Sequence, residues 1–407
     1  MAYVLLWFPR SSETFIFREV AQLRDLGLPI YVYTIYGKTL QGCSPEMRGY
    51  DGPVKRFGLT RLPLLIAAFL RALATSPRKV ARLLGEGCFQ RMRSLETLAE
   101  NSWCFLAGFL LAEQCRKDGI KLIHAPWANG PATAAWVASR MTGIPFAFTG
   151  RAGDIYPEDG ILRLKARDAL FIRTNNAANV RWLEQFCPED QRRKVHLVYN
   201  GLTFTRLAEC PLPMRPPYRL LAVGRLVPKK GFADLFTAMA RLRREYFPVH
   251  LTLVGEGFCR ATLASLRKRL KLTNCIDMIG FKTHDKLRQL IQEHDLLVMP
   301  SIIQKNGNRD GIPNVIMEAL SQRMPVVATD VCGIAEVIRN DATGVLVPPN
   351  NPDALARAIR RILTDRDRAL VMAEAGRTLV KEMFHNQKNI RALRDLYLSA
   401  AACDRKQ

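Results

Sequence analysis

Short apolar runs alternate with amphipathic helical patterns along the second half of the chain. Six runs have the length of a strand: 218–224, 249–255, 275–280, 295–300, 325–329 and 344–347. Five helical patterns accompany them, at 231–246, 260–270, 284–294, 313–323 and 352–363. Apolar strands that alternate with helices are typical of a parallel sheet covered by helices on both faces.

The first half repeats this alternation less regularly. Strands are predicted at 4–8, 30–35, 120–125, 146–149, 169–173 and 195–200. Helices are predicted between them at 13–27, 131–143 and 176–186. A long segment, 37–119, interrupts the alternation and is predicted to be mostly helical.

Together with the length, this pattern predicts an α/β protein with two domains. A chain of 407 residues exceeds what one hydrophobic core usually supports. We expect an N-terminal Rossmann-like domain over 1–199, with a helical insertion at about 38–118, and a C-terminal Rossmann-like domain over 218–379. The turn-rich segment 200–217, with four prolines, is the predicted linker. Two such domains facing each other across a cleft would bind ligands outside the carboxyl ends of their strands.

A strong excess of positive charge adds an expectation about partners. The 60 Lys and Arg residues against 37 Asp and Glu give a net charge of +23, which predicts a phosphorylated ligand, nucleic acid or an anionic membrane surface. The excess is concentrated in 54–93, where nine basic residues accompany one acid. This segment is either a solvated helical face or a helix lying in the headgroup plane of an anionic bilayer. The charge is accompanied by no zinc finger, RNP motif or aromatic–basic stripe, so we predict no nucleic-acid partner.

The sequence predicts neither a membrane span nor a metal site. The longest apolar stretch, 62–70, is far shorter than the roughly 20 residues that cross a bilayer. The start of the chain lacks the charged region of a signal peptide, so we expect a cytoplasmic protein that binds peripherally at the inner face of the membrane. The ten cysteines have no metal-ligand spacing, and the Asp-Arg-Asp at 365–367 lies between predicted helices.

The stretch NRDGIPNVIMEAL, 308–320, places one acid before a predicted helix and another inside it. Pro313 suits the first turn of that helix, where its missing N–H would have had no partner. The surrounding amides would face an anion such as phosphate at the helix N-terminus. They belong to Gly311, Ile312, Asn314 and Val315. The carboxylate of Glu318 can accept hydrogen bonds from two ribose hydroxyls, and that of Asp310 can hold another polyol. The stretch therefore predicts a ligand made of sugar, phosphate and nucleoside. The alternative is an ordinary helix start with an exposed glutamate.

A basic loop, GRLVPKKGF at 224–232, follows the first strand of the C-terminal domain. It places Arg225 and Lys230 before the next helix, where two fixed cations can neutralise a diphosphate leaving group. Cations in surface loops are common, so the loop alone is weak evidence. Its position at the same predicted sheet edge as 308–320 favours a site for a nucleotide sugar.

Five motifs follow one another over 218–363: GRLVPKKG, LVGEG, IGF, DGIPNVIMEA and PVVATDVCGIAEVI. In this order and spacing they resemble the retaining "group 1" glycosyltransferases, which have the GT-B fold. The resemblance implies that Arg225 and Lys230 hold the donor diphosphate and that Glu318 binds the ribose. Asp310, where the family usually has the longer Glu, would bind the donor sugar. Further donor contacts are implied at Gly224, Gly255, Gly280, Phe281 and the backbone of Gly311, Ile312, Pro313, Asn314 and Val315.

The N-terminal domain follows the family pattern less closely. The stretch 8–27, FPRSSETFIFREVAQLRDLG, resembles the start of members that build bacterial exopolysaccharides of the colanic-acid type, which implies a role for the loop residues Ser12 and Glu13. His124 stands where members have a histidine at a strand end, but Pro126 replaces the second histidine of that motif, and Arg151 stands at another position where a histidine is frequent. His124 is either a donor-sugar ligand or a strand-end histidine satisfied by backbone.

The resemblance implies a retaining, metal-independent enzyme without a cofactor. It would move a sugar from a UDP- or GDP-sugar to a glycan or lipid-linked acceptor in exopolysaccharide or lipopolysaccharide biosynthesis. The N-terminal domain would hold the acceptor, and a helix within 380–407 would pack back on it. In the implied front-face mechanism the leaving phosphate itself takes the acceptor proton. The alternatives are a nucleotide-sugar epimerase or phosphorylase of the same fold, a basic nucleic-acid-binding protein and an inactive scaffold.

Overall fold

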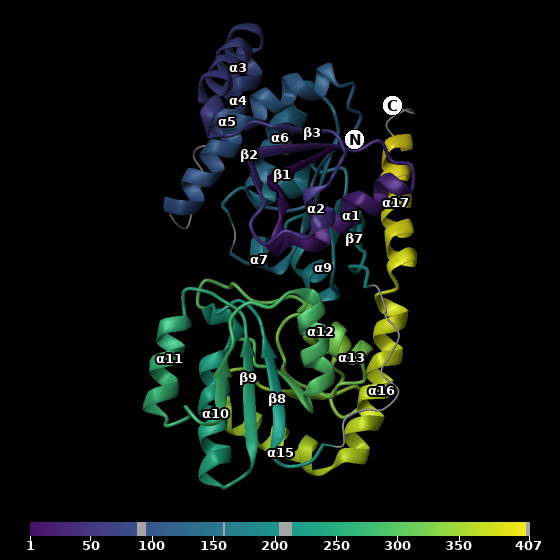
Figure 1. Ribbon diagram of the computed structural model, residues 1–407. Helices are drawn as coiled ribbons and strands as arrows, with labels where there is room; N and C mark the ends of the chain where they lie inside the picture. The colour runs from purple at the N-terminus through teal and green to yellow at the C-terminus, as the bar shows by residue number, and fades with distance from the viewer. Residues whose placement is uncertain (88–94, 158, 203–213, 404–407) are drawn as a thin grey trace. The chain divides into compact units, whose positions relative to one another are not determined.

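The chain folds into two compact units, which we describe separately (Figure 1). The computed structural model describes residues 1–87, 95–157, 159–202 and 214–403, so most of the predicted linker lies outside the described residues. One unit consists of Met1–Asn200 and Gln387–Gln407, and the other of Gly201–Asn386. Each is built on a fully parallel sheet, which confirms the predicted α/β class.

The N-terminal unit contains a seven-stranded sheet with the order β3-β2-β1-β4-β5-β6-β7. Its strands are β1 (Ala2–Arg10), β2 (Tyr31–Thr39), β3 (Val54–Arg56), β4 (Ile123–Ala125), β5 (Phe146–Gly150), β6 (Ile172–Thr174) and β7 (Val195–Leu197). Its helices are α1 (Thr14–Asp25), α2 (Pro45–Arg48), α3 (Leu62–Thr75), α4 (Pro77–Gly87), α5 (Leu95–Lys117), α6 (Gly130–Thr142), α7 (Ala152–Ile155), α8 (Leu162–Asp168), α9 (Ala177–Glu184) and α17 (Asn386–Cys403). The last helix joins this core through Leu393 and Tyr397, which pack in one cluster with Tyr3, Leu5 and Phe17.

The segment predicted as a helical insertion also contains a strand. β3 pairs in parallel with β2, with Val32 opposite Val54, and forms the edge of the sheet. The sequence pattern does not reveal β3, because two of its three residues are Lys55 and Arg56 and an edge strand needs no apolar run. The rest of the insertion consists mainly of α3, α4 and α5. In the described residues no single helix is long and apolar enough to cross a bilayer, although Leu59–Thr75 and Pro77–Gly87 pass that test together across a bend of 118°.

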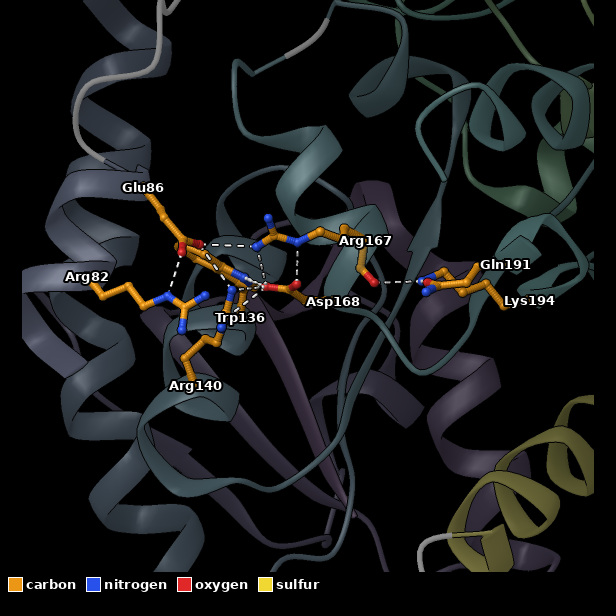
Figure 2. Close-up of polar contacts among 8 residues, drawn as sticks. All are labelled: Arg82, Glu86, Trp136, Arg140, Arg167, Asp168, Gln191 and Lys194. Atoms are coloured by element: carbon orange, nitrogen blue, oxygen red, sulfur yellow. Dashed lines mark hydrogen bonds and ion pairs between the residues drawn. The ribbon is translucent and has the colours of Figure 1, made fainter. Parts of the chain in front are cut away.

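A network of ion pairs fastens α4 to the rest of the N-terminal unit (Figure 2). Glu86 of α4 lies 2.8 Å from Arg82, 3.0 Å from Arg140 of α6 and 3.2 Å from Arg167 of α8. Arg140 and Arg167 also pair with Asp168, whose carboxylate accepts a hydrogen bond from the indole N–H of Trp136 at 2.7 Å. Arg82 is therefore engaged within the unit.

The C-terminal unit contains a six-stranded sheet with the order β10-β9-β8-β11-β12-β13. Its strands are β8 (Tyr218–Val223), β9 (Val249–Val254), β10 (Ile276–Met278), β11 (Leu296–Met299), β12 (Val326–Thr329) and β13 (Val345–Val347). Its helices are α10 (Phe232–Arg244), α11 (Arg260–Arg269), α12 (His284–Glu293), α13 (Asn314–Ser321), α14 (Ile334–Val337), α15 (Pro352–Thr364) and α16 (Arg366–Met383). In sequence terms this order is 3-2-1-4-5-6, that of a dinucleotide-binding Rossmann sheet.

Candidate functional site

The loops after β8 and β11 meet where the strand order of the C-terminal sheet reverses. These two strands are neighbours, whereas β9 lies beyond β8 and β12 lies beyond β11. Ligands of open α/β sheets bind in the crevice at such a switch point. The backbone N–H of Ile302 donates to the carbonyl of Lys229 at 2.8 Å and joins the loops. Gly231 permits the approach, because its φ is +64° and a Cβ there would lie 1.8 Å from the carbonyl oxygen of Pro300.

Two lysines from the first loop converge on one carboxylate from the second. Nζ of Lys230 lies 2.8 Å from Oδ2 of Asp310, and Nζ of Lys229 lies 3.7 Å from Oδ1. Lys229 also donates to the side-chain oxygen of Asn308 at 3.2 Å, and the hydroxyl of Ser301 donates to Asp310 at 2.7 Å. The three charged side chains are only 9–13% exposed. The structure therefore brings the predicted residues Lys230 and Asp310 into direct contact.

Burial and charge oppose each other in this lysine–aspartate cluster. Burial alone would raise the pKa of Asp310, but Lys230 and Lys229 together hold that pKa below its ordinary value. Burial lowers the pKa of Lys229; Asp310 opposes this effect, while the charges of Lys230 and Arg225 add to it. Two lysines thus share one carboxylate, with a further cation nearby. Such an excess of partly buried positive charge attracts a polyanion.

Arg225 and Glu318 complete the predicted set of charged donor residues. Arg225 is exposed directly after Gly224 and is near enough to Lys229 to affect its titration. Glu318 lies in α13 with 17% of its side chain exposed, and its carboxylate is 3.8 Å from Nδ1 of His284 in α12. Glu318 therefore lies against the helix that follows β10, a neighbour that the sequence does not predict.

The predicted glycines join the ends of three strands. The N–H of Gly224, after β8, donates to the carbonyl of Val254 at 3.0 Å, and the N–H of Gly255, after β9, donates to the carbonyl of Gly280 at 2.9 Å. Gly255 has a φ of +138°, and a Cβ there would lie 1.9 Å from the carbonyl oxygen of Gly224. Phe281 follows with 63% of its surface exposed. These residues form one rim at the carboxyl ends of β8, β9 and β10.

Helix α13 begins one residue later than predicted. Pro313 is its N-cap, with an extended backbone at φ −62° and ψ 127°, and the first helical residue is Asn314. Because the backbone of Pro313 is extended, it lies outside the helix. The first free amides of the helix therefore belong to Asn314 and Val315. Ile312 and Val315 are buried while Asn314 is exposed. Gly311 directly follows Asp310, so the helix start adjoins the lysine–aspartate cluster in the chain.

Sequence reasoning missed Lys229 and Ser301. Lys229 precedes Lys230 in the same PKK triplet, and Ser301 lies just past the buried strand β11. The resemblance implies a role for Lys230 alone and therefore does not point to Lys229. The rule that polar residues at the carboxyl ends of adjacent strands converge would have found both.

His124 lies inside the N-terminal core. It is 0% exposed, its Nε2 is 3.1 Å from the hydroxyl of Thr149, and its ring packs against Tyr3 and Tyr397 at centroid distances of 5.0 and 5.1 Å. Burial lowers its pKa to about 3, so the imidazole is neutral. Its polar partner is a threonine side chain, which is neither the donor sugar nor the backbone of the two alternatives. A fully enclosed ring offers no surface to a sugar, so we do not retain His124 in the proposed site.

Ser12 and Glu13 belong to a short 3₁₀ helix, Ser11–Glu13, directly after β1. Ser12 is exposed, whereas Glu13 is 17% exposed at its side chain and pairs with Arg10 at 3.3 Å. Burial raises the pKa of Glu13. Arg151 lies nearby in the same unit, with its guanidinium 4.5 Å from the ring centre of Phe15. The predicted N-terminal loop is thus at the carboxyl end of β1, beside an enclosed cation.

The two aspartates of the segment 365–367 lie at the start of α16. Asp365 caps α16 by accepting a hydrogen bond from the backbone N–H of Arg368 at 3.2 Å, and Asp367 is 98% exposed. Within the described ranges no three His, Cys, Asp or Glu residues gather as metal ligands would.

Comparison with known proteins shows which proteins this chain resembles. Residues 213–379 match the family of group 1 glycosyl transferases. It is 25% identical to the putative colanic acid biosynthesis glycosyltransferase WcaL of Escherichia coli, over 97% of this chain and 98% of that protein. It is 28% identical to the amylovoran biosynthesis glycosyltransferase AmsK of Erwinia amylovora, with the same two coverages.

Solved structures confirm the GT-B fold. HepE of Anabaena, in complex with UDP and glucose, is similar with a TM-score of 0.72 at 17% identity, covering 98% of this chain and 99% of that one. The lipopolysaccharide outer core galactosyltransferase WaaB, in its apo form, is similar with a TM-score of 0.70 at 13% identity and the same coverages. At these identities the structures support the fold alone.

Proposed function

We propose that this enzyme is a retaining transferase that moves a sugar from a UDP-sugar to a glycan or lipid-linked acceptor in exopolysaccharide biosynthesis. The names of its full-length relatives WcaL and AmsK, which refer to colanic acid and amylovoran, support the pathway. The complex of HepE with UDP-glucose supports the donor, and a GDP-sugar is the alternative. The single observation that carries the proposal is the cluster of Lys229, Lys230 and Asp310 at the switch point of the C-terminal sheet.

In this proposal the chain's own residues take the place of a metal ion. When the bond between the anomeric carbon and the phosphate oxygen breaks, negative charge develops on the leaving diphosphate. Lys230, Lys229 and Arg225 stabilise that charge, helped by the first amides of α13. The acceptor hydroxyl forms its bond on the same face of the sugar and gives its proton to the leaving phosphate. Glu318 holds the ribose, and Asp310 positions the two lysines and the donor sugar.

A thermal-shift screen tests the donor. UDP, UDP-glucose, GDP and GDP-mannose are each added to the full chain, since a ligand bound only by the folded state raises the melting temperature. We expect the UDP ligands to stabilise the wild type and to lose most of this effect in Lys230→Ala. Lys268→Ala, an exposed lysine of α11, is the matched control and should retain it. Equal shifts in all three proteins would show that the lysine–aspartate cluster does not bind the donor.

Turnover is expected to persist in EDTA. The proposal assigns the leaving group to fixed cations, which a chelator cannot remove. The measurement is the rate of UDP release with the donor identified by the screen, in EDTA and after addition of Mg²⁺ or Mn²⁺. A rate that collapses in EDTA and recovers with either metal contradicts this part of the proposal.

A further inference from the structure

Helix α3 presents an apolar stripe to solvent. Its inner face packs within the N-terminal unit: Leu65 and Ala68 are buried, and Phe69 packs against Phe109 of α5 at 5.1 Å between ring centres. On and just before α3, six large apolar side chains are nonetheless 39–61% exposed: Leu59, Leu62, Leu64, Ile66, Leu70 and Leu73. Most follow a spacing of three or four residues, so they share one side of the helix. A contiguous apolar face of this kind marks an interaction site.

A basic pocket of about 540 Å³ opens next to this stripe. Five cations line it: Lys55, Arg56, Arg61, Arg71 and Lys117. Leu64 also lines the pocket, which connects it with the apolar stripe. The stripe and the pocket belong to the same unit and to adjoining elements, β3, α3 and α5.

Only some of these cations have counter-ions. Lys55 pairs with Asp118 at 2.6 Å, and Arg71 pairs with Glu113 at 2.8 Å. Among the residues that the structure describes, the other three pocket cations, Arg56, Arg61 and Lys117, form no salt bridge. The structure therefore divides the cations around the pocket into two that are paired and three that form no salt bridge and line the same pocket as Leu64.

We propose that the α3 stripe and this pocket form a docking site for an anionic membrane, with the phosphate headgroup of a phospholipid in the pocket and the leucines among the upper acyl chains. The combination of a fixed positive pocket with an adjoining apolar face complements an anionic amphiphile. Nucleic acid or free phosphate would use the charges but not the leucines. In a two-fold dimer formed through this face, the positive pockets of the two copies would lie close together and repel each other. The proposal does not depend on which donor or acceptor the enzyme uses.

The test is sedimentation of the full chain with vesicles of phosphatidylcholine, with and without phosphatidylglycerol. The charge variant is Arg56→Gln, Arg61→Gln and Lys117→Gln together. Its control removes the same charge from exposed positions of the other unit, as Arg244→Gln, Lys268→Gln and Arg269→Gln. Each basic residue near an anionic surface contributes roughly fivefold to binding, so the pocket variant should bind about 100-fold more weakly and the control should change little.

A second pair of variants tests the apolar stripe. Ile66→Ser with Leu70→Ser should weaken binding about tenfold or more, because burial of each side chain in the bilayer is lost. Phe258→Ser with Val371→Ser removes two exposed apolar side chains from the C-terminal unit and should not weaken it. Binding of wild type that ignores phosphatidylglycerol overturns the proposal, as does equal loss in the pocket variant and its charge control. Binding of duplex DNA is measured with the same proteins. If the pocket variant still binds vesicles but no longer binds DNA, the pocket is a nucleic-acid site and the proposal is wrong.

Discussion

The two sheets of this chain reverse their strand order in the same way but fill the point of reversal differently. In the C-terminal unit the reversal lies between β8 and β11, and the loops beyond it hold Lys229, Lys230 and Asp310 at 9–13% exposure. In the N-terminal unit it lies between β1 and β4, where Tyr3 and His124 are register neighbours and both are 0% exposed. The C-terminal switch point keeps three charged side chains partly exposed, whereas the N-terminal one is filled by two neutral, fully enclosed rings.

The enclosed charges of the N-terminal unit form a buried network around Glu19. Its carboxylate accepts hydrogen bonds from Tyr3 and Arg173, and Arg151 lies 4.0 Å away. Tyr397 of α17 closes the network, with its hydroxyl 3.3 Å from that of Tyr3. Two tyrosine side chains thus belong to this network, whereas the hydroxyl partner of Asp310 in the lysine–aspartate cluster is that of Ser301. The comparison suggests that similar charges stabilise the fold in one unit and bind a ligand in the other.

The largest effect is expected from Glu19→Gln. The substitution leaves Arg173 and Arg151 buried without their carboxylate, and breaking a buried ion pair of this kind costs about 3–5 kcal/mol. The measurement is the free energy of unfolding from urea titration. Glu46→Gln, at an exposed position of α2, is the control and should lie within about 0.5 kcal/mol of wild type.

The same variant should show a defined dependence on pH. Burial would raise the pKa of Glu19, but Arg173 and Arg151 hold it below its ordinary value. A carboxyl group with a lowered pKa in the folded state stabilises the protein above the pKa of the unfolded chain, and this contribution is lost as the pH falls through the folded value. The difference between wild type and Glu19→Gln should therefore shrink in acid. A constant difference would mean that the charge of Glu19 is not its source.

Lys230→Ala should give the opposite result: little change in stability and a large loss of turnover. Removing one positioned charge at a developing anion costs on the order of 3 kcal/mol in transition-state stabilisation. The measurements are kcat/KM with the identified donor and urea unfolding of the same sample. Asp310 still has Lys229 as a partner in this variant, which is why the fold should survive. Wild-type kinetics, or a collapse in stability as large as that of Glu19→Gln, would erase the contrast between the units.

The sequence predicts the elements of the C-terminal unit well, because strands buried on both faces are continuous apolar runs such as 296–299. It also finds Lys230 and Asp310, but not their contact. Eighty positions separate the two residues, and only the adjacency of β8 and β11 brings them together. In the N-terminal unit, the partners of Glu19 come from β1, from β6 and from the residue after β5, and the closing tyrosine comes from α17. A pattern of local periodicity contains no information about such long-range pairs.

Asp310→Asn sharpens the comparison within the C-terminal site. Without the carboxylate, Lys229 and Lys230 lose their common counter-ion and are free to pair with a diphosphate. Free UDP should therefore bind at least as tightly as it does to wild type, while preference for one UDP-sugar over another should fall about tenfold or more, since a hydrogen bond from a charged group contributes roughly 1.5–3 kcal/mol. Isothermal titration with UDP and with several UDP-sugars measures both quantities. Equal weakening of UDP and UDP-sugars would show that Asp310 does not discriminate between sugars.

The smallest expected effect is that of Lys229→Arg, which tests whether the second lysine holds charge for the ligand. Burial lowers the pKa of Lys229, so in the free enzyme it loses its proton at a lower pH than an ordinary lysine. A neutral Lys229 cannot pair with a diphosphate, and affinity for UDP should decline a few-fold as the pH rises through this lowered pKa. Arginine stays protonated throughout this range, so Lys229→Arg should bind UDP much as wild type does near neutrality and lose less affinity at alkaline pH. The measurement is the Kd for UDP from neutral to alkaline pH at constant ionic strength. If the two profiles coincide, Lys229 does not carry charge to the ligand, and its partnership with Asp310 has only a structural role, like the buried network of the N-terminal unit.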